Sequence, residues 1–257
     1  MTTAKRTVPC KMDDTSCCSP DILTAEKEGA RRVGIMGGTF DPIHIGHLIL
    51  AENALDTFHL DEVRFMPSGH SYFKDSRPEP VSAPEDRLAM TRLAVQSNPN
   101  FSVSDMEIRR AGFTYTCETM EQLAKQEPGT DFYFLCGADS LAHMHTWYHP
   151  ERIFRVCTIL AAMRGEDVSS KVFTAAARQI ERDYGTRVAF LPARDIQVSS
   201  TEIRNRIRNG QSVRYLIPPE VAQYIRIRGL YQGGMTTEYG KQGQNKNHTE
   251  PGTESEL

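Results

Sequence analysis

The residues with the clearest chemical potential are two glycines and two histidines within residues 37–47. Gly37 and Gly38 have no side chains, so the backbone there can come close to a charged group. His44 and His47 are three residues apart and would face the same side of a helix. A helix start adds unpaired N–H groups and the positive end of the helix dipole, and both attract anions. The stretch therefore predicts a phosphate-binding site.

Two flanking segments would hold this stretch in place. Residues 33–36 form a short apolar run, which is typical of a buried strand, and apolar residues then recur at helical spacing from Leu50 to Phe58. The stretch matches neither of two common phosphate loops, because no Lys-Ser or Lys-Thr pair follows the glycines and no third glycine has dinucleotide-binding spacing. For an isolated histidine the alternative is a surface or core residue; the strand-turn-helix context favours a ligand contact.

Strand-like runs alternate with helical ones along the rest of the chain. This alternation predicts an α/β fold with a doubly wound, mostly parallel sheet, whose ligand sites lie at the carboxyl ends of the strands. Ser82 and Glu85 predict a capping box, and Gly210 and Gly229 predict helix ends. We expect strands at 33–36, 62–66, 101–104, 132–136, 158–162 and 188–191, and helices at about 46–58, 84–96, 116–125, 172–184, 200–208 and 219–228.

A second cluster of chemistry-bearing residues lies at the start of a later predicted helix, in residues 198–204. Ser199, Ser200 and Thr201 offer hydroxyls that can cap exposed amides or contact phosphate oxygens. Arg204, one turn further on, offers a fixed charge and a planar fork of donors. Ordinary helix capping with a solvated arginine is the alternative. Together with the first stretch, this cluster predicts a site for a triphosphate.

These two stretches resemble the motifs of the nucleotidyltransferase superfamily, whose members join a phosphorylated substrate to a nucleoside monophosphate from ATP or CTP. Further segments are similar in order and spacing to bacterial nicotinate-nucleotide adenylyltransferases. They are residues 109–112 followed by Tyr115-Thr116, then 137–140, then Thr146-Trp147-Tyr148, and finally 215–220 through 229–231. The resemblance runs from about Arg32 to Tyr231 and implies a Rossmann-like nucleotidyltransferase fold.

The resemblance also implies a reaction and a set of site residues. The reaction is adenylyl transfer from ATP to nicotinate mononucleotide, which gives deamido-NAD and pyrophosphate, with Mg²⁺ bound to ATP rather than held in a protein cage. Trp147 could stack on a pyridine ring, although a core or surface tryptophan is the alternative. The implied residues are His44, His47, Lys74 and Arg204 for catalysis; Gly38, Thr39, Phe40, His47, Gly137, Asp139, Arg164, Ser199, Ser200, Thr201 and Arg204 for ATP; and Lys74, Thr114, Tyr115, Trp147 and Tyr148 for the acceptor.

One segment departs from the family pattern. Members usually carry a Pro-Pro-His-Lys type loop after the second strand, whereas this chain has Ser71, Tyr72 and Phe73 before Lys74. The basic residue is kept, but the stiffness and shape of the loop change. The departure leaves open the choice between a nicotinate and a nicotinamide acceptor more than it affects the type of reaction.

Composition narrows the remaining classes of function. A chain of 257 residues with 39% hydrophobic residues can bury one full core. The formal net charge of −3 provides no overall basic field, so we expect no nucleic-acid partner. No long apolar run or signal core is present, so we expect no membrane association and a cytoplasmic location. The polar ends predict disordered tails at 1–30 and 232–257 around one nucleotidyltransferase domain at 31–231.

Several alternatives remain open from the sequence. The acceptor could be nicotinamide mononucleotide or another phosphorylated compound, and the chain could be a nucleotide sensor without catalytic activity. The sequence does not decide whether the chain forms a homo-oligomer. His143, His145 and His149 imitate a zinc site, but no suitable cysteine or carboxylate pattern accompanies them, so we interpret them as structural and expect no metal-ligating residues.

Overall fold

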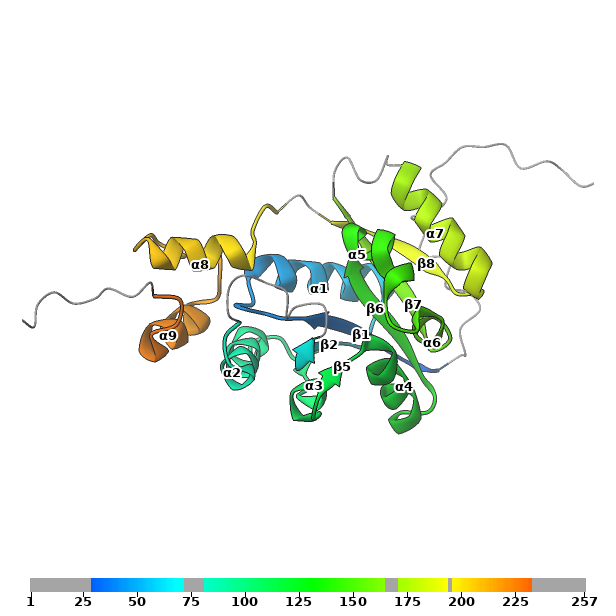
Figure 1. The fold of residues 1–257 in the computed structure, drawn as a ribbon, viewed down its shortest axis with the longest axis horizontal. Coiled ribbons are helices and arrows are strands. Elements are labelled where there is room, and N and C mark those ends of the chain that lie inside the picture. The colour runs from blue at the N-terminus through cyan, green and yellow to red at the C-terminus, as the bar shows by residue number, and fades with distance from the viewer. Residues whose placement is uncertain (1–28, 72–80, 165–170, 194–195, 233–257) are drawn as a thin grey trace, which may run out of the picture.

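A six-stranded sheet in which all neighbouring strands are parallel forms the centre of this computed structural model (Figure 1). The structure describes residues 29–71, 81–164, 171–193 and 196–232. The strand order is β4-β2-β1-β6-β7-β8. The strands are β1 (Arg31–Gly38), β2 (Glu62–Pro67), β4 (Phe101–Val103), β6 (Thr130–Gly137), β7 (Cys157–Arg164) and β8 (Val188–Ala193).

The order of the strands determines where a ligand can enter. From β1 the chain first builds outward through β2 and β4, and then returns to place β6 on the other side of β1. In open parallel sheets, ligands bind at this reversal point, just beyond the carboxyl ends of the two central strands. Those ends are Gly37-Gly38 on β1 and Gly137 on β6.

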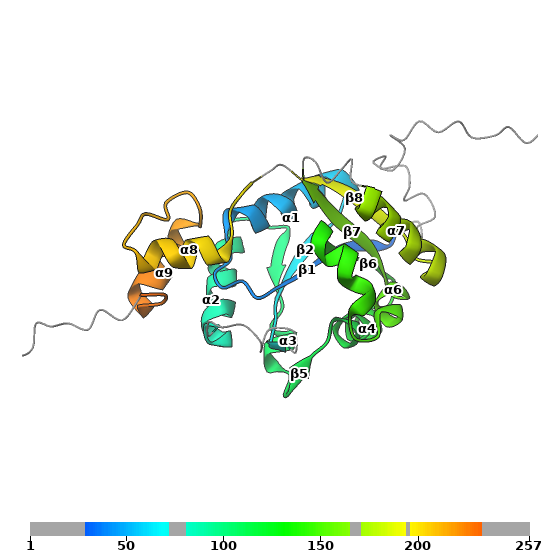
Figure 2. The ribbon, with the colours of Figure 1, turned by 45° about the horizontal axis from the view of Figure 1, so that its top comes forward.

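Helices cover both faces of the sheet and bury two separate apolar clusters (Figures 1 and 2). On one face lie α1 (Ile45–Phe58) and α2 (Pro84–Val95), and α8 (Ser200–Arg208) and α9 (Pro219–Arg228) extend the same cluster. On the other face lie α4 (Thr116–Gln126), α5 (Ala138–His143), α6 (Pro150–Phe154) and α7 (Lys171–Tyr184). Shorter elements are α3 (Met106–Arg109), the 3-10 helix η4 (Met144–Thr146), β3 (His70–Ser71) and β5 (Phe113–Thr114).

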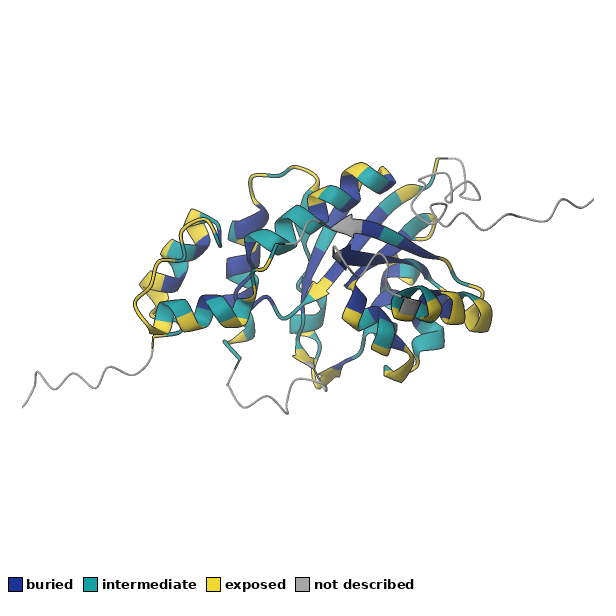
Figure 3. Cartoon of the chain, turned by 90° about the horizontal axis from the view of Figure 1, so that it is seen from above, coloured by how far each residue is buried: buried dark blue, intermediate teal, exposed yellow. Residues whose placement is uncertain are grey.

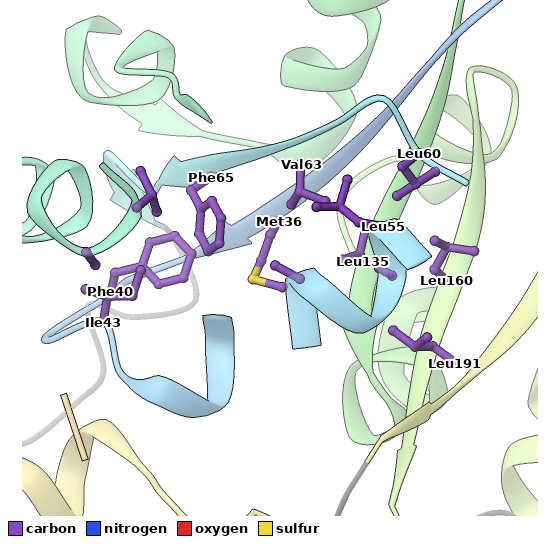
Figure 4. Packing of buried hydrophobic residues seen from close by; sticks show 14 of the residues in the cluster. Met36, Phe40, Ile43, Leu55, Leu60, Val63, Phe65, Leu135, Leu160 and Leu191 are labelled. Carbon is purple, nitrogen blue, oxygen red and sulfur yellow. The ribbon is translucent and has the colours of Figure 1, made fainter. Parts of the chain in front are cut away.

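Side chains that alternate along β1 supply both clusters. Val33 and Ile35 belong to the α4–α7 side, whereas Met36 packs on the α1 side with Phe65 of β2. Figure 4 shows Phe40, the second residue after β1, beside Phe65, and their ring centroids are 5.9 Å apart. Figure 3 shows that the strands are buried while the helices expose their outer sides. The β1–α1 turn is therefore anchored in the core at the edge where ligands would bind.

The amino end of the sheet carries a closed network of charges. Glu62, at the start of β2, is 7% exposed and accepts hydrogen bonds from Arg31, Arg64 and Ser102. Arg64 also donates to Glu127 at 2.5 Å. Each charged group in this network faces an opposite charge, so burial leaves no net charge unpaired. The network fastens β1, β2, β4 and the end of α4 together.

All six predicted strands and all six predicted helices are confirmed, and the sheet is wholly rather than mostly parallel. The capping-box prediction is wrong. Ala83, not Ser82, is the N-cap of α2, and no side chain caps it. The backbone of Ser82 bonds elsewhere: its N–H donates to Asp41 Oδ2 and its carbonyl accepts from Arg87 Nε. The short parallel pair β3–β5 was not predicted, because two-residue strands have no periodicity to detect.

Some predictions lie outside the described residues. They include nearly all of the proposed tails at 1–30 and 232–257, and the loop residues Tyr72, Phe73 and Lys74. The described part of the chain begins two residues before β1 and ends one residue after Tyr231. The division into one domain and two disordered tails stays a prediction.

Candidate active site

The starts of α1 and α8, which are distant in sequence, lie side by side (Figures 1 and 2). The hydroxyl of Ser200, the first residue of α8, donates to the Pro42 carbonyl at 2.8 Å. Arg204 Nη1, one turn further along α8, donates to the Asp41 carbonyl at 2.9 Å. The two predicted phosphate-binding stretches are thus joined directly, so the starts of α1 and α8 share one region at the carboxyl edge of the sheet.

The two histidines are stacked at the start of α1. Their ring centroids are 3.7 Å apart with an angle of 25° between the planes. His44 is the N-cap, and its backbone N–H donates to His47 Nδ1 at 3.3 Å. The His47 N–H donates to the His44 carbonyl at 3.0 Å. The His47 imidazole thus reaches back to the N-cap backbone, as the third helical residue does in a capping box.

The bond to His47 Nδ1 sets the proton position on that ring. A neutral imidazole carries one proton on its two nitrogens, so a nitrogen that accepts a hydrogen bond leaves the proton on the other. Since His47 Nδ1 accepts, the proton of the neutral His47 ring lies on Nε2. An N–H donor of this kind at a helix start suits an anionic ligand.

Two glycines make room for this arrangement. A Cβ at Gly46 would come within 3.1 Å of His44 Nδ1, and a Cβ at Gly38 would come within 2.7 Å of the Phe40 ring. Phe40 has a positive φ of 51° and is 2% exposed. Its ring also meets the His47 ring edge-on, with centroids 5.1 Å apart. The glycines therefore permit the turn that carries the imidazoles.

Two cavities open at this edge of the sheet. The first, which we call the helix-start cavity, has a volume of about 380 Å³ and is bounded by α1, β6, β7 and the segment that leads into α8. The second, which we call the aromatic cavity, has a volume of about 280 Å³. The helix-start cavity is lined by Met36, Gly37, His44, Gly46, His47, Ile49, Leu50, Asn53, Phe134, Leu135, Cys136, Gly137, Ser140, Trp147, Ala162, Ile196, Val198, Ser199 and Ser200. The aromatic cavity is lined by Ile35, Gly37, Gly38, Met66, Ser68, Glu107, Thr114, Tyr115, Thr116, Thr119, Met120, Phe134, Ser140, Trp147 and Tyr148.

The two cavities share a wall. Gly37, Phe134, Ser140 and Trp147 line both of them. The Trp147 and Phe134 rings meet edge-on with centroids 6.0 Å apart. Two ligands that fill the two cavities would therefore meet next to Gly37, at the carboxyl end of β1.

Aromatic side chains dominate the outer part of the second cavity. The Tyr115 and Tyr148 rings are 4.3 Å apart and tilted by 34°. Thr114 is 8% exposed and its hydroxyl donates to the His70 carbonyl at 3.3 Å. Faces of aromatic rings suit a flat heterocycle. The structure thus brings the predicted acceptor residues Thr114, Tyr115, Trp147 and Tyr148 into one cavity.

Sequence reasoning missed two hydrogen-bonded polar residues, Thr119 and Glu107, in the wall of the aromatic cavity. Thr119, which is 2% exposed, donates to Glu107 Oε1 at 2.9 Å and accepts from Arg110 Nη1 at 3.0 Å. Arg110 Nη2 also donates to Gln122 at 2.8 Å. Glu107 lies on the short helix α3, which has no periodic signal, so the pattern alone could not have found it. Its partner Thr119 lies three residues after Thr116 on α4 and could have been found by helical spacing.

The predicted ATP residues are only partly gathered in the helix-start cavity. His47, Gly137, Ser199 and Ser200 line it. Gly38 lines the aromatic cavity instead, and the buried ring of Phe40 belongs to the core, so Phe40 could reach a nucleotide only through its backbone. Asp139, Thr39, Thr201 and Arg204 line neither cavity. Arg204 instead holds the β1–α1 loop through its bond to the Asp41 carbonyl.

Two predicted cations cannot be placed in the site. Lys74 is outside the described residues, and Arg164 is the last residue of β7, paired in register with Ala193 of β8. Among the described residues that line the two cavities, Glu107 is the one Asp, Glu, Lys or Arg. Burial raises the pKa of the Cys136 thiol to about 12, so this thiol is neutral near pH 7. Across the described ranges, no cluster of three or more His, Cys, Asp or Glu residues could hold a metal ion. No helix in that part of the chain is long and apolar enough to cross a membrane.

Comparison with known proteins agrees with this geometry. The family model described as Cytidylyltransferase-like matches residues 35–206. Relatives named "Probable nicotinate-nucleotide adenylyltransferase" from Synechococcus sp. (strain JA-3-3Ab) and Lachnoclostridium phytofermentans are each 41% identical over 204 residues, covering 78% of this chain and 95% or 99% of theirs. Plasmodium falciparum nicotinic acid mononucleotide adenylyltransferase, solved in complex with NaAD, has the same fold, with a TM-score of 0.61 at 17% identity over 78% of this chain and 97% of that one. The chain therefore belongs to the nicotinate-nucleotide adenylyltransferases, within the cytidylyltransferase-like family.

Proposed function

We propose that this chain transfers the adenylyl group of ATP to nicotinate mononucleotide. A phosphate oxygen of the mononucleotide attacks the α-phosphorus of ATP, the bond from that phosphorus to the β-phosphate oxygen breaks, and pyrophosphate leaves. The products are deamido-NAD and pyrophosphate. This is the activity for which the curated relatives are named.

The single observation that carries the proposal is the wall shared by the two cavities. The helix-start cavity has the imidazoles and helix starts that suit a triphosphate, and the aromatic cavity has the flat side chains that suit a pyridine ring. Because both cavities reach Gly37, bound ATP and mononucleotide would bring the α-phosphorus and the attacking phosphate together there. Positioning two reactants in this way supplies a large part of catalysis.

The imidazoles would act as hydrogen-bond donors rather than as bases. A phosphate monoester has a second pKa of about 6 and is already a dianion near pH 7, so the attacking oxygen has no proton to lose. His44 and His47 would donate to phosphate oxygens of ATP, where negative charge changes position during the transfer. The bond from the His44 N–H to His47 Nδ1 and the stacking of the two rings hold the imidazoles in place beforehand.

The remaining charge would be balanced by cations. Lys74 and Arg204 are the proposed protein contributions. The described residues that line the helix-start cavity include no carboxylate and offer imidazole, hydroxyl, amide and backbone groups. Mg²⁺ would therefore enter as the MgATP substrate, coordinated by triphosphate oxygens and water. Backbone N–H groups at the starts of α1 and α8 would add to the attraction for the phosphates.

Recognition of the acceptor would depend on the aromatic cavity. Trp147 and Tyr148 offer ring faces, and the backbone around Thr114 and Tyr115 borders the same space. The choice of nicotinate over nicotinamide is part of the proposal and is supported by the names of the curated relatives. A cytoplasmic location belongs to the proposal as well, and homo-oligomer formation stays an open prediction.

A pyrophosphate-release assay tests the function directly. The purified 257-residue chain is incubated with MgATP and either nicotinate or nicotinamide mononucleotide, and the dinucleotide product is measured by chromatography. We expect turnover with both components present and a higher kcat/KM for nicotinate mononucleotide. Preference for the amide would change the proposed substrate. Binding of both ligands without pyrophosphate release would instead support the nucleotide-sensor alternative.

A further inference from the structure

The β1–α1 loop, residues 39–44, is held by donors from distant parts of the chain. Buried Arg87 of α2 donates from Nη1 to the Thr39 carbonyl at 2.8 Å. Arg204 of α8 donates to the Asp41 carbonyl at 2.9 Å. Peptide groups are planar, with the carbonyl and N–H pointing in opposite directions. The bond to Thr39 therefore turns the N–H of Phe40 away from Arg87.

The centre of this arrangement is the carboxylate of Asp41. It is 4% exposed, although it lies three residues from His44 and close to where we place the triphosphate. Its Oδ1 accepts from the Tyr231 hydroxyl at 2.5 Å, and its Oδ2 accepts from the Ser82 N–H at 3.3 Å. A buried carboxylate needs such donors, because its charge is poorly solvated. Both oxygens are engaged, so this side chain holds the loop rather than facing the cavity.

Tyr231 comes from the segment that follows α9, almost at the end of the described chain. Its φ is 61°, a left-handed conformation that non-glycine residues adopt only when their surroundings enforce it. The ring packs against the α1-side cluster. Burial, together with the neighbouring Asp41 charge, raises the pKa of its hydroxyl, so the group remains a protonated donor. The contact to Asp41 spans 190 positions in the sequence.

We infer that Tyr231 is a positioning residue that acts through Asp41 on the imidazoles of His44 and His47. The hydroxyl holds the Asp41 side chain in place. His44, the N-cap of α1, follows Asp41 by three residues, so the position of Asp41 determines where α1 begins. The segment after α9 is then part of the active-site construction, although Tyr231 lines neither cavity. The inference rests on the proposed function, since it concerns the same transfer step.

The chain offers a matched control for this inference. Tyr224, on α9, donates its hydroxyl to the buried carboxylate of Asp86 on α2 at 2.7 Å. This bond also ties the C-terminal part to the body of the protein, but it does not involve the β1–α1 loop. Removing either hydroxyl removes one tyrosine–carboxylate bond and leaves the ring. Only removal of the Tyr231 hydroxyl should affect the rate of adenylyl transfer.

The experiment compares Tyr231→Phe and Tyr224→Phe in the full chain. For each variant, kcat and KM for ATP are measured with saturating nicotinate mononucleotide, and Tm is measured separately. We expect both substitutions to lower Tm. We expect Tyr231→Phe alone to reduce kcat by at least about tenfold, with KM for ATP within about threefold of wild type, because misplaced imidazoles weaken transition-state binding more than ground-state binding.

A second substitution tests the route through Asp41. Asp41→Asn keeps the size of the side chain and removes its charge, so we expect it to lower kcat too. If Tyr231 acts only through Asp41, the double variant should lose about as much as the more affected single variant. Asp41→Asn also serves as the test if Tyr231→Phe does not fold.

The outcomes separate this inference from the proposed function. An inactive wild-type chain would overturn the function itself. An active wild type together with a Tyr231→Phe variant that keeps kcat within twofold would overturn only the positioning role. Equal losses of kcat in Tyr231→Phe and Tyr224→Phe would also overturn it, since that result would mean a general effect on the fold.

Discussion

The two ends of the central sheet are both polar, yet they are built differently. At the amino end, Glu62, Arg64 and their partners form ion pairs with one another, and they line neither of the two cavities. At the carboxyl end, imidazoles, hydroxyls and backbone groups surround two cavities. Opposite charges that pair within the protein stabilise the fold, whereas polar groups around a cavity suit an anion that brings its own charge.

This contrast predicts that substitutions at the two ends have different consequences. Changes at the carboxyl end should affect turnover or ligand binding with limited effect on folding. Changes at the amino end should affect folding and leave kcat unaltered, because the charge network lies at the opposite edge of the sheet from Gly37.

The largest expected effect is on catalysis at the carboxyl end. His47→Ala should reduce kcat by about 10²- to 10³-fold, because it removes a fixed donor to the phosphates. Pyrophosphate release with both substrates measures the loss. His47→Gln is the matched control for the helix start, since glutamine at this position can still accept from the His44 N–H. Turnover like wild type in a folded His47→Ala protein would contradict the assignment.

The next effect is on stability at the amino end. Glu62→Gln keeps the shape of the side chain but removes the negative charge at position 62 that pairs with Arg64 and Arg31. Hydrogen bonds to charged groups contribute about 1.5–3 kcal/mol each to stability, so we expect a loss of about 2–3 kcal/mol in the free energy of unfolding. Urea unfolding measures it. A fall in kcat measured well below Tm would contradict the proposed separation of the two ends.

The loss of stability caused by Glu62→Gln should depend on pH. Burial, the largest single influence, raises the pKa of Glu62, but hydrogen bonds from Arg64 and Ser102 and the charges of Arg64 and Arg31 outweigh it and lower the pKa below 4.5. A carboxylate with a lowered folded-state pKa stabilises the protein above its unfolded-state pKa and ceases to do so as pH falls through the folded value. The stability difference between wild type and Glu62→Gln should therefore be constant near neutrality and shrink below pH 4.5. A difference that grows in acid would contradict this assignment.

The smallest expected effect concerns the shared wall. Trp147→Ala should weaken binding of the pyridine mononucleotide by about tenfold, in line with the value of about 0.5–1.5 kcal/mol for an aromatic pair beyond its buried area. ATP affinity should change much less, although Trp147 also borders the helix-start cavity. Calorimetric titration with each ligand measures both, and Trp147→Phe should recover part of the loss. Equal losses for the two ligands would indicate that Trp147 only supports the wall.

The fold could be predicted in detail from the sequence because its signals are local. Strands such as β6 and β7 are continuous apolar runs, and α8 and α9 begin and end at residues with strong preferences there, such as Ser199 and Gly229. The capping box at Ser82 failed because a distant group, Asp41, attracts the backbone of that residue. A local rule could not detect this competition.

The site was predictable only as far as its motifs are contiguous. The stretch 37–47 and the cluster at 198–204 could be recognised as pieces, and their meeting followed from the parallel sheet. Two hydrogen bonds join residues that share no sequence pattern, so only the folded chain reveals them. They link Tyr231 to Asp41 and Thr119 to Glu107.

The wall that separates the two cavities has a consequence for the end of the reaction. Before transfer, two molecules occupy the two sides and can dissociate independently. Afterwards, a single dinucleotide would span Trp147 and Phe134, and one half that comes loose would remain tethered by the other at a high effective concentration. Escape of the product would therefore be slower than escape of either starting compound, and a rapid first turnover would precede a slower steady rate.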